Sequence, residues 1–115
     1  MTDDFPALRT ELRQGYRDLM QVIPDQMKGF GDLHRSAVKD GALNQATKEL
    51  MAVAIAICTR CDDCITLHMH DALRAGATPE MVHEAIGVAL LMGGGPASTY
   101  ATHAIRALEQ YSAHA

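Results

Sequence analysis

Two cysteines and one histidine are the residues of this sequence best suited to chemistry. Cys61 and Cys64 are separated by two residues, and His68 follows four residues after the second cysteine. On a helix these positions, i, i+3 and i+7, lie along one face, so both thiols and an imidazole share a narrow stripe. Thiols at this spacing can form a disulfide on mild oxidation with little movement of the backbone. We predict thiol redox chemistry centred on Cys61 and Cys64.

Two physical effects compete over which sulfur is the nucleophile. The first turn of a helix stabilises a thiolate through its free N–H groups and its dipole, and this favours Cys61. A neighbouring base favours Cys64, because His68 lies one turn beyond it and can accept its proton. The dipole is worth only about 0.3 to 1 kcal/mol at an exposed site and is opposed by Asp62 and Asp63. The same carboxylates also oppose a thiolate at Cys64, so the difference in reactivity between the two thiols is small. We expect Cys64 to attack.

Glu49 is the carboxylate best placed to support His68. If the segments on either side of Arg60 form an antiparallel helical hairpin, Glu49 lies 11 residues before the turn and His68 lies 8 residues after it. These separations correspond to about 16 Å and 12 Å along the two helix axes, so the side chains lie at a similar depth. A carboxylate among apolar neighbours needs a hydrogen-bond partner, and His68, directly or through a water, is the available one. Glu49 would then orient or charge the histidine that ionises a cysteine.

Prolines, glycines and capping residues divide the chain into the helices that must position these groups. Asn44 can cap an apolar helix from Gln45 to about Thr59, and the helix that follows the first cysteine runs from about Asp62 to Ala75. The other expected helices are residues 4–22, 24–38, 79 to the glycine run at 93–95, and 96–111. No alternating strand pattern competes. We predict an all-α fold, a single-domain bundle of about six helices over residues 1–115, with the cysteine pair at the start of a central helix.

The segment from Leu50 to Ile57 is apolar on all sides of its predicted helix. Such a helix needs cover from the rest of the domain and from a second subunit, which predicts a homo-oligomer. Methionines, Met51 and Met92 among them, are expected to fill the core. The histidines other than His68 have no reactive neighbours in the sequence and are expected at the surface or at an interface; they are His34, His70, His83, His103 and His114.

The composition argues against several classes of function. A chain of 115 residues has room for one core and for no separate substrate domain. The net charge of -4, with no cluster of basic residues, argues against nucleic acid or an anionic membrane as a partner. The longest apolar run is roughly half of what a membrane helix needs, and the acidic N-terminus lacks the features of a secretory signal. We expect a cytoplasmic protein, in which a close cysteine pair is catalytic or metal-binding before it is structural.

The complete pattern resembles a known active-site motif. Glu49, eleven residues, Cys61-x-x-Cys64, three residues and His68 are similar to the motif of the AhpD-like alkylhydroperoxidase family, within the carboxymuconolactone decarboxylase superfamily. The resemblance extends through the segment Ala75-Gly76-Ala77-Thr78 and the helix after it, and covers roughly residues 40–95. Four residues at fixed spacing are far more specific than a CxxC pair alone.

This resemblance implies an all-helical oligomer, a trimer or hexamer, in which Cys64 attacks a hydroperoxide and Cys61 resolves the sulfenic acid as a disulfide. Glu49 and His68 would relay protons, and an external protein or small-molecule dithiol would reduce the pair. No bound cofactor and no metal is expected. One position departs from the family, because well-studied members carry a histidine immediately before the second cysteine, where this chain has Asp63. Its charge disfavours a thiolate at Cys64.

Other interpretations fit parts of the pattern. The cysteines could be small buried core residues, or Cys58, Cys61, Cys64 and His68 could bind zinc, although a continuous helix cannot wrap around one ion. A carboxymuconolactone decarboxylase-like lyase or isomerase would use His68 and Glu49 as acid and base on a lactone. A non-catalytic oligomeric binding protein would hold a small ligand in a cleft. Thiol-dependent reduction of hydroperoxides, an antioxidant function, is the leading hypothesis because the cysteine pair stands at the motif spacing.

Overall fold

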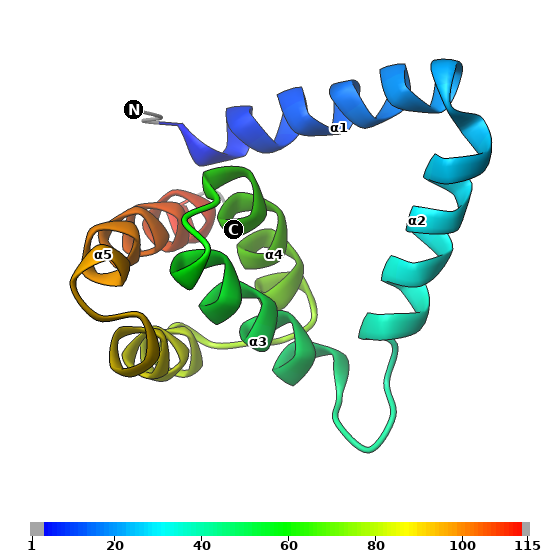
Figure 1. Cartoon of the computed structure of the whole chain (residues 1–115). Helices are drawn as coiled ribbons and strands as arrows, with labels where there is room; N and C mark the ends of the chain where they lie inside the picture. The colour runs from blue at the N-terminus through cyan, green and yellow to red at the C-terminus, as the bar shows by residue number, and fades with distance from the viewer. Residues whose placement is uncertain (1–3, 114–115) are drawn as a thin grey trace.

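Five helices make up the part of the chain that the structure describes. The computed structural model describes residues 4–113, and within that range it contains no strand. The helices are α1 (Phe5–Val22), α2 (Pro24–Val38), α3 (Gln45–Cys58), α4 (Asp62–Arg74) and α5 (Pro79–Ala113). Helices α3, α4 and α5 pack together as a bundle, while α1 starts against this bundle and runs outward to α2, so that the two form a bent arm (Figure 1). The predicted all-α fold is confirmed.

The helix boundaries follow the capping residues of the sequence. Asp4 caps α1, since its side chain accepts the N–H of Ala7 at 2.9 Å, and Asn44 accepts the N–H of Thr47 at 2.9 Å at the start of α3. Pro24 begins α2 directly after α1, because a proline has no N–H with which to continue the preceding helix. The predicted boundaries of the first four helices therefore lie within about one residue of the observed ones.

Gly94 divides α5 into two helical halves. Its φ of 67° and ψ of -149° are not helical, and a positive φ of this kind is adopted easily only by glycine. The halves, residues 79–93 and 95–113, correspond to the two helices predicted on either side of the glycine run. The six predicted helices are thus present as five, the last with a sharp kink, and both halves of α5 contribute to the core.

The main hydrophobic core lies between α3, α4 and the two halves of α5. Its members from α3 and α4 include Val53, Ile57, Ile65 and Met69, which are fully buried. The second half of α5 contributes mainly alanines, whose small side chains allow the helices to approach closely. By contrast, α1 buries only Phe5 and α2 buries no residue. The arm is therefore held to the bundle mainly at its beginning.

A buried hydroxyl group fixes the start of the arm. Thr66 of α4 donates a hydrogen bond to the carbonyl oxygen of Phe5 at 2.5 Å, and its oxygen lies 2.7 Å from the hydroxyl of Tyr111. The hydroxyl of Tyr111 also donates to the carbonyl oxygen of Thr66 at 3.3 Å. Because the hydroxyl proton of Thr66 is used by Phe5, Tyr111 shares its single proton between the two oxygens of Thr66. Burial raises the pKa of Tyr111 above its usual value, while the hydrogen bond with Thr66 acts in the opposite direction. These residues join α1, α4 and the end of α5.

One face of α3 and the region before the kink in α5 remain uncovered in the single chain. Met51 and Ile55 are 50% and 60% exposed, and Met92 is 77% exposed. The prediction that Met51 and Met92 fill the core is wrong, because Met51 shares a helix face with Ile55, on the side away from the buried Val53 and Ile57. No helix within residues 4–113 is both long and apolar enough to span a membrane.

Candidate functional site

A tight turn between α3 and α4 positions the cysteine pair. Arg60 has a left-handed backbone with a φ of 58°, which is unfavourable for a residue with a side chain. It allows the N–H of Arg60 to donate to the carbonyl of Ile57 at 3.2 Å and the N–H of Cys61 to donate to that of Ala56 at 3.0 Å. This pair of bonds closes the end of α3. As a result Cys61 is the capping residue of α4.

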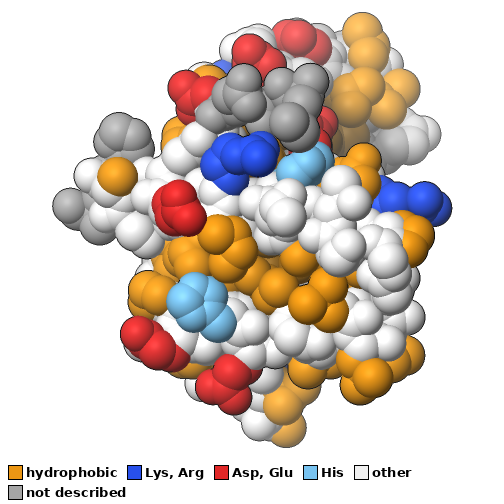
Figure 2. All heavy atoms as spheres, turned by 90° about the vertical axis from the view of Figure 1, so that its left-hand side faces the viewer, with side chains coloured by type: hydrophobic (Ala, Val, Ile, Leu, Met, Phe, Trp, Pro, Cys, Tyr) orange, Lys and Arg blue, Asp and Glu red, His pale blue; other side chains and the backbone are white. Residues whose placement is uncertain are grey.

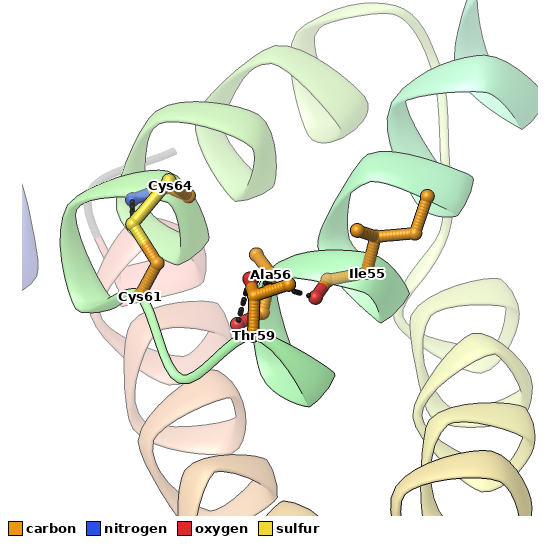
Figure 3. The surroundings of a disulfide bond; sticks show 5 residues. All are labelled: Ile55, Ala56, Thr59, Cys61 and Cys64. Carbon is orange, nitrogen blue, oxygen red and sulfur yellow. Dashed lines mark hydrogen bonds between the residues drawn. A yellow bond between two sulfur atoms is a disulfide. The ribbon is translucent and has the colours of Figure 1, made fainter.

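Cys61 and Cys64 are joined by a disulfide, with their Cα atoms 5.2 Å apart. Figure 3 shows this bond at the first turn of α4, next to the end of α3, where the hydroxyl of Thr59 donates to the carbonyl of Ile55 at 3.0 Å. The sulfur of Cys61 also accepts the N–H of Cys64 at 3.2 Å. One of the free N–H groups at the start of α4 is therefore directed at the sulfur of Cys61. The pairing is the one expected from the sequence, within one chain.

Glu49 and His68 meet as the hairpin geometry predicted. The side chain of Glu49 is 1% exposed, and its Oε1 lies 2.6 Å from Nδ1 of His68, whose side chain is 20% exposed. When the carboxylate holds a proton on Nδ1, the other ring nitrogen, Nε2, is left to accept one. The second oxygen of Glu49, Oε2, is buried and has no hydrogen-bond partner among the described residues. A buried carboxylate that orients a partly exposed imidazole is an arrangement suited to a general base.

A cleft of about 300 Å³ lies beside these groups, between the arm and α4. Cys64, His68 and Asp63 of α4 line it, so one of the two cysteines and the histidine border the same space. The remaining walls are largely apolar and come mostly from the arm; among them are Leu12, Tyr16, Phe30, Leu33 and Val38. The cleft can hold a small apolar molecule against the reactive groups.

His103 was expected at the surface or at an interface, and this expectation is wrong. It is a buried residue of α5, and its Nδ1 lies 2.7 Å from Oδ1 of Asp62. The alanines around it, such as Ala101, Ala104 and Ala107, mark a core-facing stripe of this helix, a signal that sequence reasoning could have used. Asp62, which follows Cys61 in the sequence, is therefore a paired carboxylate rather than a free one.

His34 is a second residue that sequence reasoning missed. It is a half-buried residue of α2, and its ring centre is 5.7 Å from that of His68. It also lines the cleft beside Cys64. Nothing in the sequence around His34 points to this contact, because it depends on how the arm folds back over the bundle.

Cys58 lies outside the candidate site. Its sulfur donates a weak hydrogen bond to the carbonyl oxygen of Ala89 in α5, at 3.4 Å, and it remains a free thiol. The Cys58 thiol is thus hydrogen-bonded to α5, whereas Cys61 and Cys64 form a disulfide with each other. The group of Cys58, Cys61, Cys64 and His68, considered above for zinc, is not assembled as a set of four ligands.

Residues 24–107 match the carboxymuconolactone decarboxylase family. An uncharacterised protein from Cupriavidus necator is 40% identical over 105 residues, which cover 91% of this chain and 93% of that protein. An uncharacterised protein from the cox locus of Paracoccus denitrificans is 44% identical over 81 residues, which cover 70% of this chain and 73% of that protein.

Two solved structures are similar over almost the whole chain. A carboxymuconolactone decarboxylase family protein from Legionella pneumophila has a TM-score of 0.92 at 37% identity, with 96% of this chain and 99% of that chain covered. A member of the same family from Thermotoga maritima, suggested to be involved in an antioxidative response, has a TM-score of 0.83 at 30% identity, with 91% and 90% covered. The likeness therefore includes the arm as well as the bundle.

Proposed function

We propose that this chain, which belongs to the carboxymuconolactone decarboxylase family, is a thiol-dependent peroxidase that reduces small organic hydroperoxides through Cys61 and Cys64. One observation carries the proposal. Cys64 and His68 line the same cleft, and a fully buried carboxylate, that of Glu49, holds the histidine. The antioxidative response suggested for the Thermotoga maritima relative agrees with this role.

The first step is the formation of a Cys64 thiolate. His68 takes the thiol proton on Nε2, directly or through a water, while Glu49 stabilises the positive charge that develops on the ring. The thiolate attacks the terminal oxygen of the hydroperoxide. The O–O bond breaks, Cys64 becomes a sulfenic acid, and the alkoxide takes the proton from His68 to leave as an alcohol.

The second step closes the disulfide. The thiolate of Cys61 attacks the sulfur of the Cys64 sulfenic acid and expels hydroxide, which leaves as water after protonation. The N–H of Cys64 favours the thiolate form of Cys61, since it is directed at that sulfur. The hydroperoxide has then gained two electrons from the pair. An external dithiol, of the kind that keeps thiols reduced in the cytoplasm, then reduces the disulfide and restores the two thiols.

The cleft favours a small uncharged substrate. Its walls are largely apolar, and its volume of about 300 Å³ limits the size of the organic group. Asp63, an exposed carboxylate on the same wall, repels a substrate that carries a negative charge near the peroxide. We therefore expect cumene hydroperoxide to react faster than a hydroperoxide that carries a carboxylate at a similar distance.

We also propose that the protein works as a homo-oligomer, a trimer or a hexamer. Figure 2 shows hydrophobic side chains gathered on the face of the molecule that α5 presents. Exposed apolar residues of the first half of α5 include Val88, Leu91 and Met92, and Ile55 is exposed on α3. Monomeric proteins rarely leave apolar side chains clustered in this way.

Thiol titration tests the peroxidase proposal. The protein is reduced, freed of reductant and mixed with one equivalent of cumene hydroperoxide, in a Cys58→Ser background so that only the pair contributes thiols. Loss of two thiols for each alcohol formed is the expected result. The double variant with serine at Cys61 and Cys64 is the matched control and should leave the hydroperoxide unconsumed.

Two outcomes would contradict the proposal and point elsewhere. If small disulfides oxidise the pair but the hydroperoxide is left intact, the protein is a dithiol-disulfide oxidoreductase without peroxidase activity. If a lactone substrate is turned over after both thiols have been alkylated, the lyase alternative with Glu49 and His68 as acid and base replaces it.

A further inference from the structure

Four potential metal ligands from three helices come together next to the proposed proton relay. His34 belongs to α2, Glu49 to α3, and His68 and Asp71 lie one turn apart on α4. One ligand atom from each residue lies within 4.8 Å of those from the others. His34, Glu49 and Asp71 also line a cavity of about 440 Å³ that opens to solvent. A small ion can therefore reach the group.

Glu49 supplies an independent sign that a ligand belongs here. The residue is fully buried, and only its Oε1 is used, by Nδ1 of His68. Its Oε2 is buried without a hydrogen-bond partner among the described residues. An unpaired carboxylate oxygen in such a place is unfavourable, because it has lost its hydration without compensation. A cation bound to this oxygen would provide that compensation.

We propose that His34, Glu49, His68 and Asp71 form a binding site for a divalent transition-metal ion such as Zn²⁺. Imidazole nitrogens suit zinc and its neighbours in the first transition row, whereas Mg²⁺ and Ca²⁺ prefer shells made of oxygen alone. Two carboxylates balance the two positive charges of the ion, and neutral imidazoles complete a four-ligand set.

Small side-chain movements are enough to form this site. In a tetrahedral zinc site with bonds of about 2.0 to 2.1 Å, ligand atoms are separated by about 3.3 Å. The ligand atoms, which all lie within 4.8 Å of one another, must therefore close by up to about 1.5 Å. Rotation of the partly exposed His34 can provide part of this, and Asp71 can provide the rest by turning away from Nδ1 of His70, with which its Oδ1 is paired at 2.9 Å. Arg35 and Arg74 line the same cavity, and Arg35 is already paired with Asp32. The positive charge of Arg74 on the cavity wall opposes a bound cation and lowers the affinity for it.

The metal site shares Glu49 and His68 with the proposed peroxidase mechanism, but its test does not depend on that mechanism. Binding is measured on the oxidised protein, in which Cys61 and Cys64 are joined and offer no thiolate to a metal. The Cys58→Ser background removes the third thiol. Failure to bind a metal would leave the peroxidase proposal untouched, and failure to reduce a hydroperoxide would leave the metal site untouched.

The experiment is a titration of untagged, chelator-treated, oxidised protein with Co²⁺ followed by visible absorption, and with Zn²⁺ followed by calorimetry. We expect one metal ion per chain. The bound Co²⁺ should show the visible d–d bands of a four-coordinate ion and no thiolate-to-cobalt charge-transfer band. His34→Ala and Asp71→Asn should each weaken the affinity by about tenfold or more. The control is His83→Ala, which removes an exposed histidine of α5 and should leave the affinity unchanged.

Weaker metal binding by His34→Ala cannot be attributed to a loss of folding. Helix α2 buries no residue, so His34→Ala should keep the helical circular dichroism and the melting temperature of the metal-free protein. Absence of binding in the Cys58→Ser protein would overturn the proposal. Binding with equal affinity in the His34→Ala, Asp71→Asn and His83→Ala variants would also overturn it, since the metal would then be held elsewhere.

Discussion

Replacement of Glu49 by glutamine tests whether the buried carboxylate drives the proposed chemistry. Glu49→Gln keeps the shape of the side chain and an oxygen that can accept the proton on Nδ1 of His68, but it removes the negative charge. The ring therefore keeps its orientation, and Nε2 is still available as a base. The predicted change is a slower oxidation of the thiols by hydroperoxide in a protein whose fold is intact.

The size of the effect follows from the geometry. Oε1 lies 2.6 Å from Nδ1, so the centres of the two charges are about 4 Å apart, and at an effective dielectric constant near 20 they attract each other by about 4 kcal/mol. If about half of a unit charge has reached His68 in the transition state, the variant loses about 2 kcal/mol, or about 30-fold in rate. Full loss of base assistance would be larger, about a hundredfold or more.

The assay is the pseudo-first-order loss of thiols after addition of excess cumene hydroperoxide, from pH 6 to 8, in the Cys58→Ser background. Glu84→Gln is the matched control, because Glu84 is an exposed carboxylate on α5 and its loss should leave the rate unchanged. Circular dichroism and a thermal melt establish that the fold is kept. A Glu49→Gln rate equal to that of the parent protein across this pH range would remove Glu49 from the mechanism.

Three further predictions concern the sulfurs, the assembly and the buried phenol. In Cys61→Ser, hydroperoxide should convert Cys64 to a sulfenic acid that dimedone captures, while Cys61 in Cys64→Ser should react much more slowly; the reverse order would exchange their roles. Sedimentation velocity at micromolar concentration should show an oligomer that Leu91→Glu weakens, and a monomeric parent protein would refute the proposed assembly. Because burial raises the pKa of Tyr111 above 10.0, folding stability should fall as the pH rises from that value through the raised pKa. Urea denaturation should find a smaller loss in Tyr111→Phe, and an equal loss would contradict the assignment.

The helices were predictable because their boundaries depend on local chemistry. Asn44, Pro24 and Gly76 act on the backbone within a few residues of themselves; Gly76, for example, follows the end of α4 with a φ of 105°. Capping and helix termination can therefore be recognised without knowing the rest of the fold. The meeting of Glu49 with His68 was also predictable, since a short turn at Arg60 fixes the depth of both residues on two adjacent helices. The left-handed φ of 58° at Arg60 lets α3 end and α4 begin within a few residues.

The position of the arm was not predictable in the same way. Helix α2 has no buried residue, so its hydrophobic pattern gives no strong indication of the surface on which it rests. The contact of His34 with His68 depends on how the arm is attached to the bundle. That attachment is at Phe5, far from His34 along the chain, through the hydrogen bond that Thr66 donates to the Phe5 carbonyl. A contact that depends on such long-range placement cannot be predicted from the spacing of residues near it in the sequence. This explains why the contact of His34 was missed while that of Glu49 was predicted.

The contacts of the two sulfurs also imply how the proposed cycle divides between them. Cys61 accepts the N–H of Cys64, and the carboxylate beside it, Asp62, is paired with His103, so a thiolate at Cys61 is better stabilised than sequence alone suggested. Cys64 lines the cleft with His68. In thiol-disulfide exchange the better-stabilised thiolate is the better leaving group. An external dithiol should therefore attack Cys64 and expel Cys61, so that hydroperoxide and reductant use the same cleft in turn.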